Sequence, residues 1–562
     1  MLAHLALSLT LLRHTTLAVN SYRELPWYGN EQSQVQLHSA ELEVQLRAAC
    51  PKYQDYSVHP QYVSCFRLCS LEPKIEKRLI KITNSPPFSD GPMSLPFQRP
   101  ARVCRTFESD AVEEVIEDMK SRMVDKDLAR IFENAFPNTL DTTVAWHVDA
   151  NSNRRRFRHP RDSSSSRWEG AQSFIVTGDI NAEWLRDSTN QLTGYLKLMK
   201  RDKKLEQLIL GAINTQAEFV IASPYCNAFQ PPPPSKLEPS CIWQDIVNPV
   251  YENSTVFECK YELDSLAAFL DLSNQFHENS GSTAFLTDRW YMALESLMEV
   301  LEQQTKPTFD PQTGAFKRNP YTFRRNTDTG TETLNLAGAG NPLGGGTGLI
   351  RSAFRPSDDA SIFGYLIPAN AMMAVQLKRT AKLLDSVGKS RTASMIRRRG
   401  EDLEAAVWEH GVVDHKRYGR VFAYEVDGYG STLLMDDANL PSLLALPRLG
   451  FLDVDDEVYQ NTRRMVLERQ GNPYYLTGSE FEGIGGPHVG VSNAWPMSVL
   501  VRALTSSDDG EIKNALEAVK KVSSLGLIHE SVHVNNQKSY TSTYFLFHVT
   551  FGLNCCFSRG GL

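Results

Sequence analysis

The stretch TGDINAEWLRDSTNQLTGYL (residues 177–196) sets Trp184, Arg186 and Asp187 side by side at the start of an apolar helix. A helix start that needed only a cap could use Asp or Ser alone. Read by itself, Asp187 is a plausible N-cap and Arg186 its partner in an ion pair. A large ring, a permanent cation and a carboxylate together also fit a surface that holds a polar, ring-shaped molecule. The rest of the chain bears on this choice.

Five further apolar segments are each preceded by a polar cluster of the same kind. The clusters are KYELDS (260–265), FRPSDDAS (354–361), YGSTLLMDDAN (429–439), GPHVGVSNAW (486–495) and QKSYTST (537–543). Amphipathic, charge-rich helices lie between the apolar segments, for example at 288–304 and 392–410. Strand-like alternation is sparse, with short candidates such as RVFAYEVDG (420–428). The sequence therefore predicts a mainly α protein.

Six apolar helices that alternate with amphipathic ones fit an (α/α)6 barrel, in which the apolar helices form the inner ring. Up-and-down alternation would place all six inner N-termini at one end of the barrel. The six polar clusters would then converge on one pocket, where helix dipoles add positive potential. The alternative is six ordinary N-caps, which explains any single cluster better. Six clusters, each with Trp, Tyr, Arg or paired acids, favour the pocket.

Composition and charge narrow the class of protein. The chain has 562 residues, of which 41% are hydrophobic and 22% charged, as is usual for a soluble globular protein. Its net charge of −7 argues against a nucleic-acid partner, because binding to a phosphate backbone needs a basic field.

The N-terminus indicates a secretory route. Residues 2–12 form an apolar run of signal-peptide length, although a short membrane anchor or a buried helix are alternatives. We divide the chain into a signal peptide (1–19), an N-terminal extension (20–85) and a catalytic domain (86–562). The sequon at Asn253 agrees with a location in the secretory pathway or outside the cell. No stable membrane span is expected after removal of the signal, since no later stretch approaches transmembrane length.

Nine cysteines fit several disulfides, and none forms a paired C-x-x-C zinc pattern. A bond between Cys226 and Cys241 would close a loop that contains PPPP, although the sequence alone does not fix the pairing. LIHESVHV brings His529 and His533 near each other, but a loop that presents Glu530 is the better interpretation than a metal pair. We expect no metal and no cofactor.

The clusters combine carboxylates with aromatic rings, which suits a carbohydrate. Carboxylates accept hydrogen bonds from sugar hydroxyls, rings cover the apolar sugar face, and two carboxyls can hydrolyse a glycosidic bond. The chain has no G-x-S-x-G elbow, no phosphate-binding P-loop and no H-E-x-x-H motif. The acidic residues in or near the clusters are Asp187, Glu262, Asp264, Asp358, Asp359, Asp436, Asp437, Glu480, Glu482 and Glu530.

Five ordered blocks, GDINAEWLRDSTNQ, KYELDSL, FRPSDDA, GGPH and HES, resemble the signature of glycoside hydrolase family 125. The resemblance covers residues 85–550 and implies an (α/α)6 barrel and a metal-independent, inverting exo-α-1,6-mannosidase. It places the general acid on Asp359, with Asp358 as the alternate, and the general base on Glu530. An adjacent like charge would raise the pKa of the acid, and we expect the other Asp to be an N-cap.

The remaining clusters are then expected to bind the terminal mannose of a mannose-containing oligosaccharide or glycoprotein glycan. The binding residues would be Trp184, Arg186, Asp187, Glu262, Asp264, Arg355, Asp358 and His488. For Glu262 and Asp264 an ion pair with Arg186 is an equal alternative, and Arg355 pairs with an acid or holds the acceptor sugar. Trp495 is expected in the core, and a Gly-Gly-Pro turn would expose His488.

The C-terminus departs from the family pattern, with Tyr540 and Tyr544 where a Trp is expected and a final HVTFGLNCCFSRGGL. Two alternative functions therefore stay open. One is another (α/α)6 glycosidase specificity, such as an α-glucosidase. The other is a glycan-binding protein without turnover. The intact Asp358, Asp359 and Glu530 favour catalysis.

Overall fold

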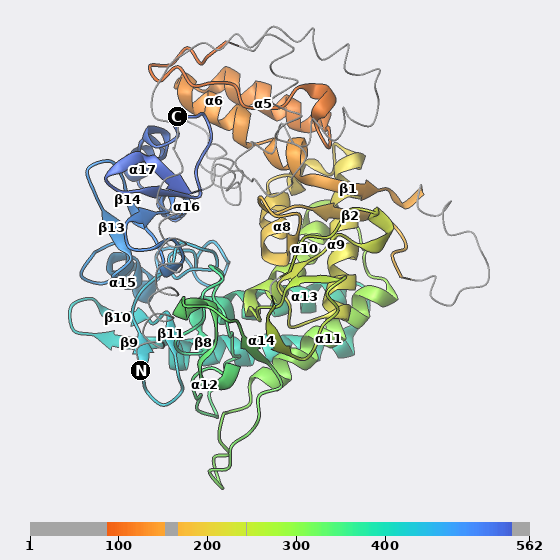
Figure 1. The fold of residues 1–562 in the computed structure, drawn as a ribbon, viewed down its shortest axis with the longest axis vertical. Coiled ribbons are helices and arrows are strands. Elements are labelled where there is room, and N and C mark those ends of the chain that lie inside the picture. Colours follow the sequence, from red (N-terminus) through yellow and green to blue (C-terminus); the bar gives the residue numbers. More distant parts are fainter. Residues whose placement is uncertain (1–86, 152–166, 243, 542–562) are drawn as a thin grey trace, which may run out of the picture. The chain divides into compact units, whose positions relative to one another are not determined.

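The computed structural model describes residues 87–151, 167–242 and 244–541 of the chain (Figure 1). The predicted signal peptide, the extension up to residue 85, Tyr544 and the sixth apolar segment lie outside the described residues. The mainly helical architecture predicted from the sequence is confirmed. The helices are α5 (Asp110–Arg122), α6 (Lys126–Ala135), α8 (Leu185–Thr193), α9 (Lys203–Ala222), α10 (Leu263–Ser280), α11 (Asp288–Gln304), α12 (Asn335–Gly338), α13 (Ile367–Ser386), α14 (Ser390–Gly411), α15 (Glu457–Val466), α16 (Pro496–Leu504) and α17 (Asp509–Lys521).

Four of the predicted apolar segments form the inner helices α8, α10, α13 and α16. Their side chains are buried on nearly every face, as is typical of a helix surrounded by other helices. Helix α10 packs against both α8 and α13, so neighbours along the predicted inner ring are neighbours in space. This arrangement is the (α/α)6 barrel expected from the alternating pattern.

The helices between them form an outer layer and are amphipathic. In α11 the buried residues Trp290, Leu294, Leu297 and Leu301 recur every three or four positions along one face. Helix α11 packs beside α9, α14 packs on α13, and α17 packs on α16. Helix α9 is buried more widely than α11, because the β1–β2 hairpin (Val144–Val148 and Gln172–Ile175) contributes a strand that packs on it.

The fifth apolar segment, LPSLLAL (440–446), is not the predicted inner helix but a series of turns. Its start is capped as a helix would be, since the Asp436 carboxylate accepts hydrogen bonds from the Leu443 and Leu444 amides, at 2.8 and 2.9 Å. A helix cannot continue from there, because Pro447 lacks an amide hydrogen and its ring would clash with the preceding turn. Gly450, at φ +80°, then redirects the chain.

Three small antiparallel sheets lie at the starts of the inner helices. Their strand orders are β3-β4-β6, β12-β11-β8 and β15-β16-β17, and β3, β8 and β15 run directly into α8, α13 and α16. The sheets therefore fix the inner helix starts, where the polar clusters lie. Their strands are β3 (Glu183–Trp184), β4 (Ala228–Phe229), β6 (Val256–Glu258), β8 (Tyr365–Leu366), β11 (Glu425–Val426), β12 (Thr432–Leu433), β15 (Asn493–Ala494), β16 (Ser531–His533) and β17 (Asn536–Thr541).

Three further two-stranded sheets lie away from the starts of the inner helices. Their members are β5 (Ile246–Asn248) with β7 (Thr322–Arg324), β9 (Val412–His415) with β10 (Gly419–Phe422), and β13 (Tyr475–Thr477) with β14 (Glu482–Ile484). The strand-like stretch at 420–428 accordingly contributes β10 and β11, as expected.

The structure settles one pairing that the sequence left open: Cys226 bonds to Cys259, and Cys241, the other partner considered, is a free, exposed thiol. The pairing follows from the β4–β6 ladder, in which Ala228 lies opposite Glu258. Cys226 and Cys259 flank this pair, with a Cα–Cα distance of 3.9 Å. Sheet register, rather than the proline-rich loop, selects the partner.

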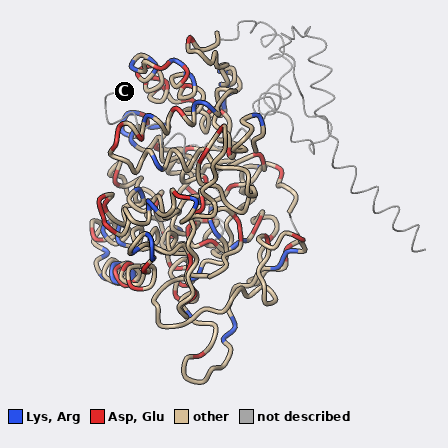
Figure 2. Tube along the Cα trace, turned by 90° about the vertical axis from the view of Figure 1, so that its left-hand side faces the viewer, with Lys and Arg blue, Asp and Glu red and all other residues tan. Residues whose placement is uncertain are grey.

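Within the described ranges, none of the helices combines the length and apolarity needed to cross a membrane. Lys and Arg alternate with Asp and Glu along the chain trace in Figure 2.

Candidate active site

Arg186 is the centre of a buried ion cluster at the starts of α8 and α10. Its Nη1 donates hydrogen bonds to Glu262 at 2.6 Å and to Asp264 at 3.0 Å, and its Nη2 lies 3.2 Å from Asp187. The ion pair that the sequence left as an alternative for Glu262 and Asp264 is therefore present. Asp187 is not the N-cap of α8, since the helix begins at Leu185.

Asn227 joins this cluster to the segment that carries the predicted acid. Its Nδ2 lies within hydrogen-bond distance of both Glu262 Oε1 (3.2 Å) and Asp358 Oδ1 (3.3 Å). Its own oxygen accepts from the Lys260 amide, and its carbonyl accepts from the Leu185 amide. Asn227 thus holds together the starts of two inner helices and the RPSDDA segment, through its backbone carbonyl at α8 and its carboxamide at the other two.

The cluster contains more acids than bases, so it retains protons near neutral pH. Burial raises the pKa of Asp187 to about 7, opposed by Arg186 and assisted by the Asp358 charge. Burial also raises the pKa of Glu262 well above its usual value, again against Arg186. Protonated carboxyls donate hydrogen bonds and ionised ones accept them. A ligand with many hydroxyl groups could use both.

The two aspartates of the RPSDDA segment occupy different environments. Asp358 is half-buried and has φ +67°, a left-handed conformation that costs energy for a residue other than Gly. Burial favours its neutral form, but Lys260 and Arg186 outweigh this and lower the pKa of Asp358. Asp358 is therefore held ionised beside the Arg186 cluster.

Asp359 is held towards its neutral form. Its residue surface is 1% exposed, and burial, together with the Asp437 carboxylate, raises its pKa. Among the described residues its Oδ2 has no hydrogen-bond partner, and His488 Nδ1 lies 3.9 Å from it. The expectation that one of the two aspartates is an N-cap is wrong, because α13 begins only at Ile367.

Glu530 lies in a loop directly before β16, so the sequence placed it correctly in a loop rather than in a helix with His529 and His533. Burial raises its pKa, and a hydrogen bond from Thr541 and the nearby His488 oppose this rise. The charge of Asp358 acts on it as well.

His488 lies beside the predicted acid and acts electrostatically on the predicted base. It follows the Gly-Gly-Pro turn and has a side chain 36% exposed, as the sequence led us to expect. It acts electrostatically on Asp358, Asp359 and Glu530 alike. The RPSDDA, GGPH and HES blocks, which are far apart in sequence, therefore lie close together in the structure.

Arg355 takes the first of its two predicted alternatives and pairs with an acid. Its Nε donates to Glu425 at 2.6 Å, and the residue is 2% exposed. The other oxygen of Glu425 accepts from the Ile362 and Phe363 amides. Arg355 thereby ties β11 to the loop between the RPSDDA segment and α13.

Three aromatic residues of the predicted clusters are buried or half-buried, and Trp495 lies in the core as expected. Trp495 and Tyr261 are buried, and Tyr261 packs against Tyr225 and Tyr321. Trp184 is half-buried and its ring packs against Phe257, with centroids 5.5 Å apart.

Two acids from the sequence list also lie outside the cluster. Glu480 pairs with Lys521 at 3.1 Å, and Glu482 lies 3.9 Å from Arg502. Their charges are thus neutralised by α16 and α17 rather than directed at the Arg186 cluster.

The sequence did not single out Asn227, Lys260 or Asp437 as site residues. Lys260 stands in the KYELDS cluster and Asp437 in MDDAN, so both were within reach of the pattern. Asp437 accepts a hydrogen bond from the Ser357 hydroxyl at 2.8 Å. No sequence motif pointed to Asn227, because it lies in the loop between α9 and β4 and not at the start of an apolar helix. Within the described ranges, no group of three or more His, Cys, Asp and Glu residues could hold a metal ion.

Comparison with known proteins gives a consistent result. A family model described as metal-independent alpha-mannosidase (GH125) matches residues 125–553. The Meiotically up-regulated gene 157 protein of Schizosaccharomyces pombe is 50% identical over 499 residues, which cover 88% of this chain and 90% of that protein.

Among solved structures, a metal-independent alpha mannosidase of Streptococcus pneumoniae in a non-productive complex with alpha-1,6-mannobiose is similar. It has a TM-score of 0.69 and 30% identity, covering 81% of this chain and 99% of that one. The glucoamylase of Saccharomycopsis fibuligera is more distant, at 12% identity and a TM-score of 0.44 over 83% of this chain and 99% of its own.

Proposed function

Because this chain belongs to the GH125 family of metal-independent alpha-mannosidases, we propose that it is an exo-acting α-1,6-mannosidase that inverts anomeric configuration. The convergence of Asp359, His488 and Glu530 beside the Arg186 cluster carries the proposal. The α-1,6-mannobiose bound by the Streptococcus pneumoniae relative supports the choice of linkage.

In the proposed mechanism Asp359 is the general acid. A general acid must be protonated before the reaction, and burial with a neighbouring carboxylate keeps Asp359 in that form. It donates its proton to the glycosidic oxygen as the bond to the terminal mannose breaks. Asp358, which Lys260 and Arg186 hold ionised, contacts the sugar instead.

Glu530 is the proposed general base. Its carboxylate takes a proton from a water molecule on the opposite face of the sugar, and the hydroxide character of that water allows attack on the anomeric carbon. Single displacement releases β-mannose and requires the two carboxyls to stand about 6.5–9.5 Å apart to leave room for the water. His488, near both carboxyls, stabilises their ionised forms.

The Arg186 cluster is proposed to bind the terminal mannose. Asp187, Glu262 and Asp264 offer both protonated and ionised oxygens to the sugar hydroxyls, and Arg186 fixes their positions. Trp184, at the edge of the same helix start, covers the sugar ring, and Arg355 acts through its pair with Glu425.

The test is to incubate the purified protein with α-1,6-mannobiose, α-1,2-mannobiose and maltose and to follow the anomeric protons by NMR. We expect β-mannose first, from the 1,6-linked sugar alone, and no effect of a chelator. Cleavage of maltose would instead assign an α-glucosidase. Saturable binding of the 1,6-linked sugar without release would assign a glycan-binding protein without turnover. Release of α-mannose would overturn the inverting mechanism.

We further propose that the protein enters the secretory pathway. The Cys226–Cys259 disulfide fits an oxidising compartment, and Asn253 of the sequon is exposed in a turn. Expression in eukaryotic cells followed by endoglycosidase treatment tests this route. We expect a loss of mass that the Asn253→Gln variant does not show, whereas equal masses with and without the enzyme would count against it.

A further inference from the structure

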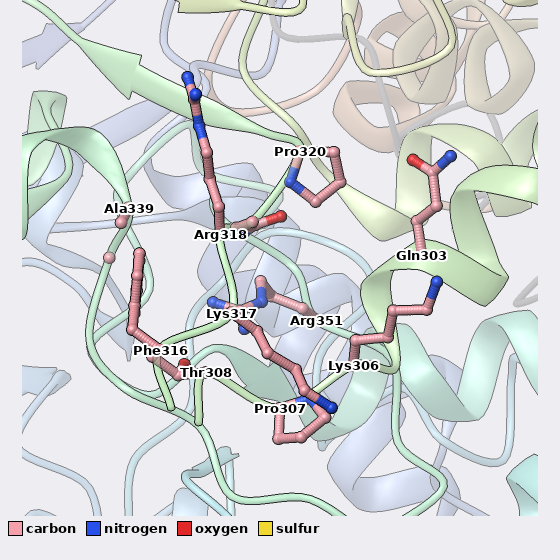
Figure 3. A pocket seen from close by; sticks show the side chains of 12 residues that line it. Gln303, Lys306, Pro307, Thr308, Phe316, Lys317, Arg318, Pro320, Ala339 and Arg351 are labelled. Carbon is pink, nitrogen blue, oxygen red and sulfur yellow. The ribbon is translucent and has the colours of Figure 1, made fainter. Parts of the chain in front are cut away.

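A pocket of about 300 Å³, lined by none of the candidate active-site residues, lies where α11 ends and the following loop turns back. Four cations line it: Lys306, Lys317, Arg318 and Arg351. No Asp or Glu is among the described residues that form its wall. Figure 3 shows Arg351 and Lys317 near its middle, whereas the side chain of Arg318 extends away from them. A basic pocket is unexpected in a chain of net charge −7.

Arg351 is the informative member of the four. It is 6% exposed, its backbone amide is fixed by the Gln304 carbonyl at 3.0 Å, and burial lowers the pKa of its guanidinium, which nonetheless stays cationic. Its guanidinium makes no hydrogen bond or ion pair with any other described residue, in contrast to Arg186 and Arg355. Charged side chains are almost never buried unless paired. The partner of Arg351 is therefore expected to be a ligand.

The other groups around Arg351 also donate rather than accept. Lys306 and Arg318 are exposed and form no ion pair with the described residues, and Lys317 pairs only with the partly exposed Asp310, at 2.9 Å. The Asn319 oxygen already accepts from Gln304 and the Tyr321 amide, which leaves its NH₂ group available. A ligand in this pocket therefore meets hydrogen-bond donors and positive charge.

We propose that this pocket binds a phosphate group, either as inorganic phosphate or carried by a sugar. A planar guanidinium and several ammonium groups match the oxygens and the double negative charge of phosphate. The volume is at the lower end for ligand pockets and leaves room for a sugar ring beside the phosphate. A monocarboxylate would neutralise only one of the four cations.

The pocket is also connected to the candidate active site. Two and three residues after Arg351, the Ala353 and Phe354 amides both donate to the Tyr261 carbonyl, next to Glu262. The same extended segment then continues into Asp358 and Asp359. A phosphate held by Arg351 would anchor one end of this segment, so a phosphorylated glycan or free phosphate can be sensed there.

Isothermal titration of the full-length protein in phosphate-free buffer tests the proposal without using activity. We expect one saturable site for sodium phosphate in the wild type, and an affinity at least about tenfold weaker in Arg351→Met, since Met removes the charged hydrogen-bond donors. Because Arg351 is buried, the exposed double variant Lys306→Gln/Arg318→Gln provides a second arm that leaves the core intact. It should weaken binding and flatten its salt dependence.

Arg398→Gln, at a side chain 84% exposed on α14, is the matched control and should bind phosphate as the wild type does. Mannose 6-phosphate distinguishes the sources. If mannose 6-phosphate binds the wild type more tightly than phosphate does, and Arg351→Met binds it only as weakly as mannose, the ligand is a phosphorylated sugar. If mannose 6-phosphate and phosphate bind the wild type equally well, the ligand is the free anion. Absence of phosphate binding by the wild type, or binding unchanged in both pocket variants, overturns the proposal.

Discussion

Arg186 donates a 2.6 Å hydrogen bond to Glu262, although the two residues belong to the starts of different inner helices and lie 76 positions apart. The bond joins the first turn of α8 to the N-terminus of α10, and both side chains are almost fully buried. Asp187 and Asp264 share the same guanidinium. The residues proposed to bind mannose are therefore also what fixes two helices of the inner ring to each other.

Substitution of Arg186 by Met should reduce the stability of the fold as well as sugar binding. Removal of the guanidinium leaves Glu262, Asp264 and Asp187 buried without their cation, which typically costs about 3–5 kcal/mol. Chemical unfolding followed by circular dichroism measures the change. Arg398→Gln on the surface should stay within about 0.5 kcal/mol of the wild type. An Arg186→Met protein that unfolds with the wild type would show that the cluster carries no stability.

Substitution of Glu530 by Gln should lower turnover of α-1,6-mannobiose by about 10²–10⁴-fold, the usual contribution of a general base. Sugar affinity and the circular dichroism spectrum should change little, because Gln keeps the size of the side chain. Near-normal turnover would remove Glu530 from the role of base.

The pH dependence of the wild type gives a separate check on Glu530. A base must be ionised, and burial raises the pKa of Glu530 above its ordinary value of 4.5. Activity should therefore fall, as the pH is lowered, through a midpoint above 4.5. A profile of kcat/KM against pH measures this limb, which the residual activity of Glu530→Gln should lack. A midpoint below 4.5 would contradict the burial of this carboxyl.

The roles of Asp358 and Asp359 can be distinguished with a substrate whose leaving group needs no protonation. Asp359→Asn should abolish hydrolysis of α-1,6-mannobiose but retain most activity on 2,4-dinitrophenyl α-mannoside, whose leaving group departs without protonation. Asp358→Asn should reduce both activities, because its proposed contact is with the mannose itself. The opposite result, with the activated substrate rescuing Asp358→Asn alone, would assign the acid to Asp358.

The features that the sequence predicted correctly are those that the periodic pattern of apolar residues determines. The apolar stripe of Trp290, Leu294 and Leu297 predicts α11 because it depends only on the 3.6-residue repeat. The convergence of Arg186 with Glu262 likewise follows from the alternation of inner and outer helices, which places all inner helix starts together. Neither inference requires knowledge of how two distant strands pair.

What the sequence missed depends on contacts across long separations. Cys226 pairs with Cys259 because of the register between β4 and β6, which no spacing of cysteines specifies. Asn227 joins the cluster through the same sheet, without a motif of its own. The fifth apolar segment, residues 440–446, does not form a helix for a local reason, because Pro447 follows it directly. The prediction gave more weight to the apolar pattern than to this proline.

The Cys226–Cys259 disulfide should stabilise the fold through the loop that it closes. The two cysteines are 33 positions apart, and a loop of this length corresponds to about 3–4 kcal/mol on the chain-entropy scale. The double variant Cys226→Ser/Cys259→Ser should lose this much in chemical unfolding. Cys241→Ser, at the exposed free thiol, is the matched control and should match the wild type. If only Cys241→Ser lowers the free energy of unfolding, the disulfide is not the one between Cys226 and Cys259.

Glu183 gives the fold a pH dependence of its own. It begins β3 directly before the Trp184–Asp187 cluster, and its carboxyl accepts a hydrogen bond from the Ile175 amide at 3.0 Å. Burial raises its pKa from 4.5 to about 8. Between these two values the folded chain holds a proton that the unfolded chain has lost. The contribution of Glu183 is therefore complete below pH 4.5 and is lost as the pH rises to about 8.

Glu183→Gln separates this effect from the other buried acids. Gln keeps an acceptor for the Ile175 amide and never ionises, so the variant lacks the Glu183 slope. Its free energy of unfolding relative to the wild type should increase by about 1.4 kcal/mol for each pH unit between pH 5 and pH 8. Urea unfolding at several pH values measures the difference. If the difference is the same at pH 5 and pH 8, Glu183 is ionised in the folded protein, and burial does not hold its proton.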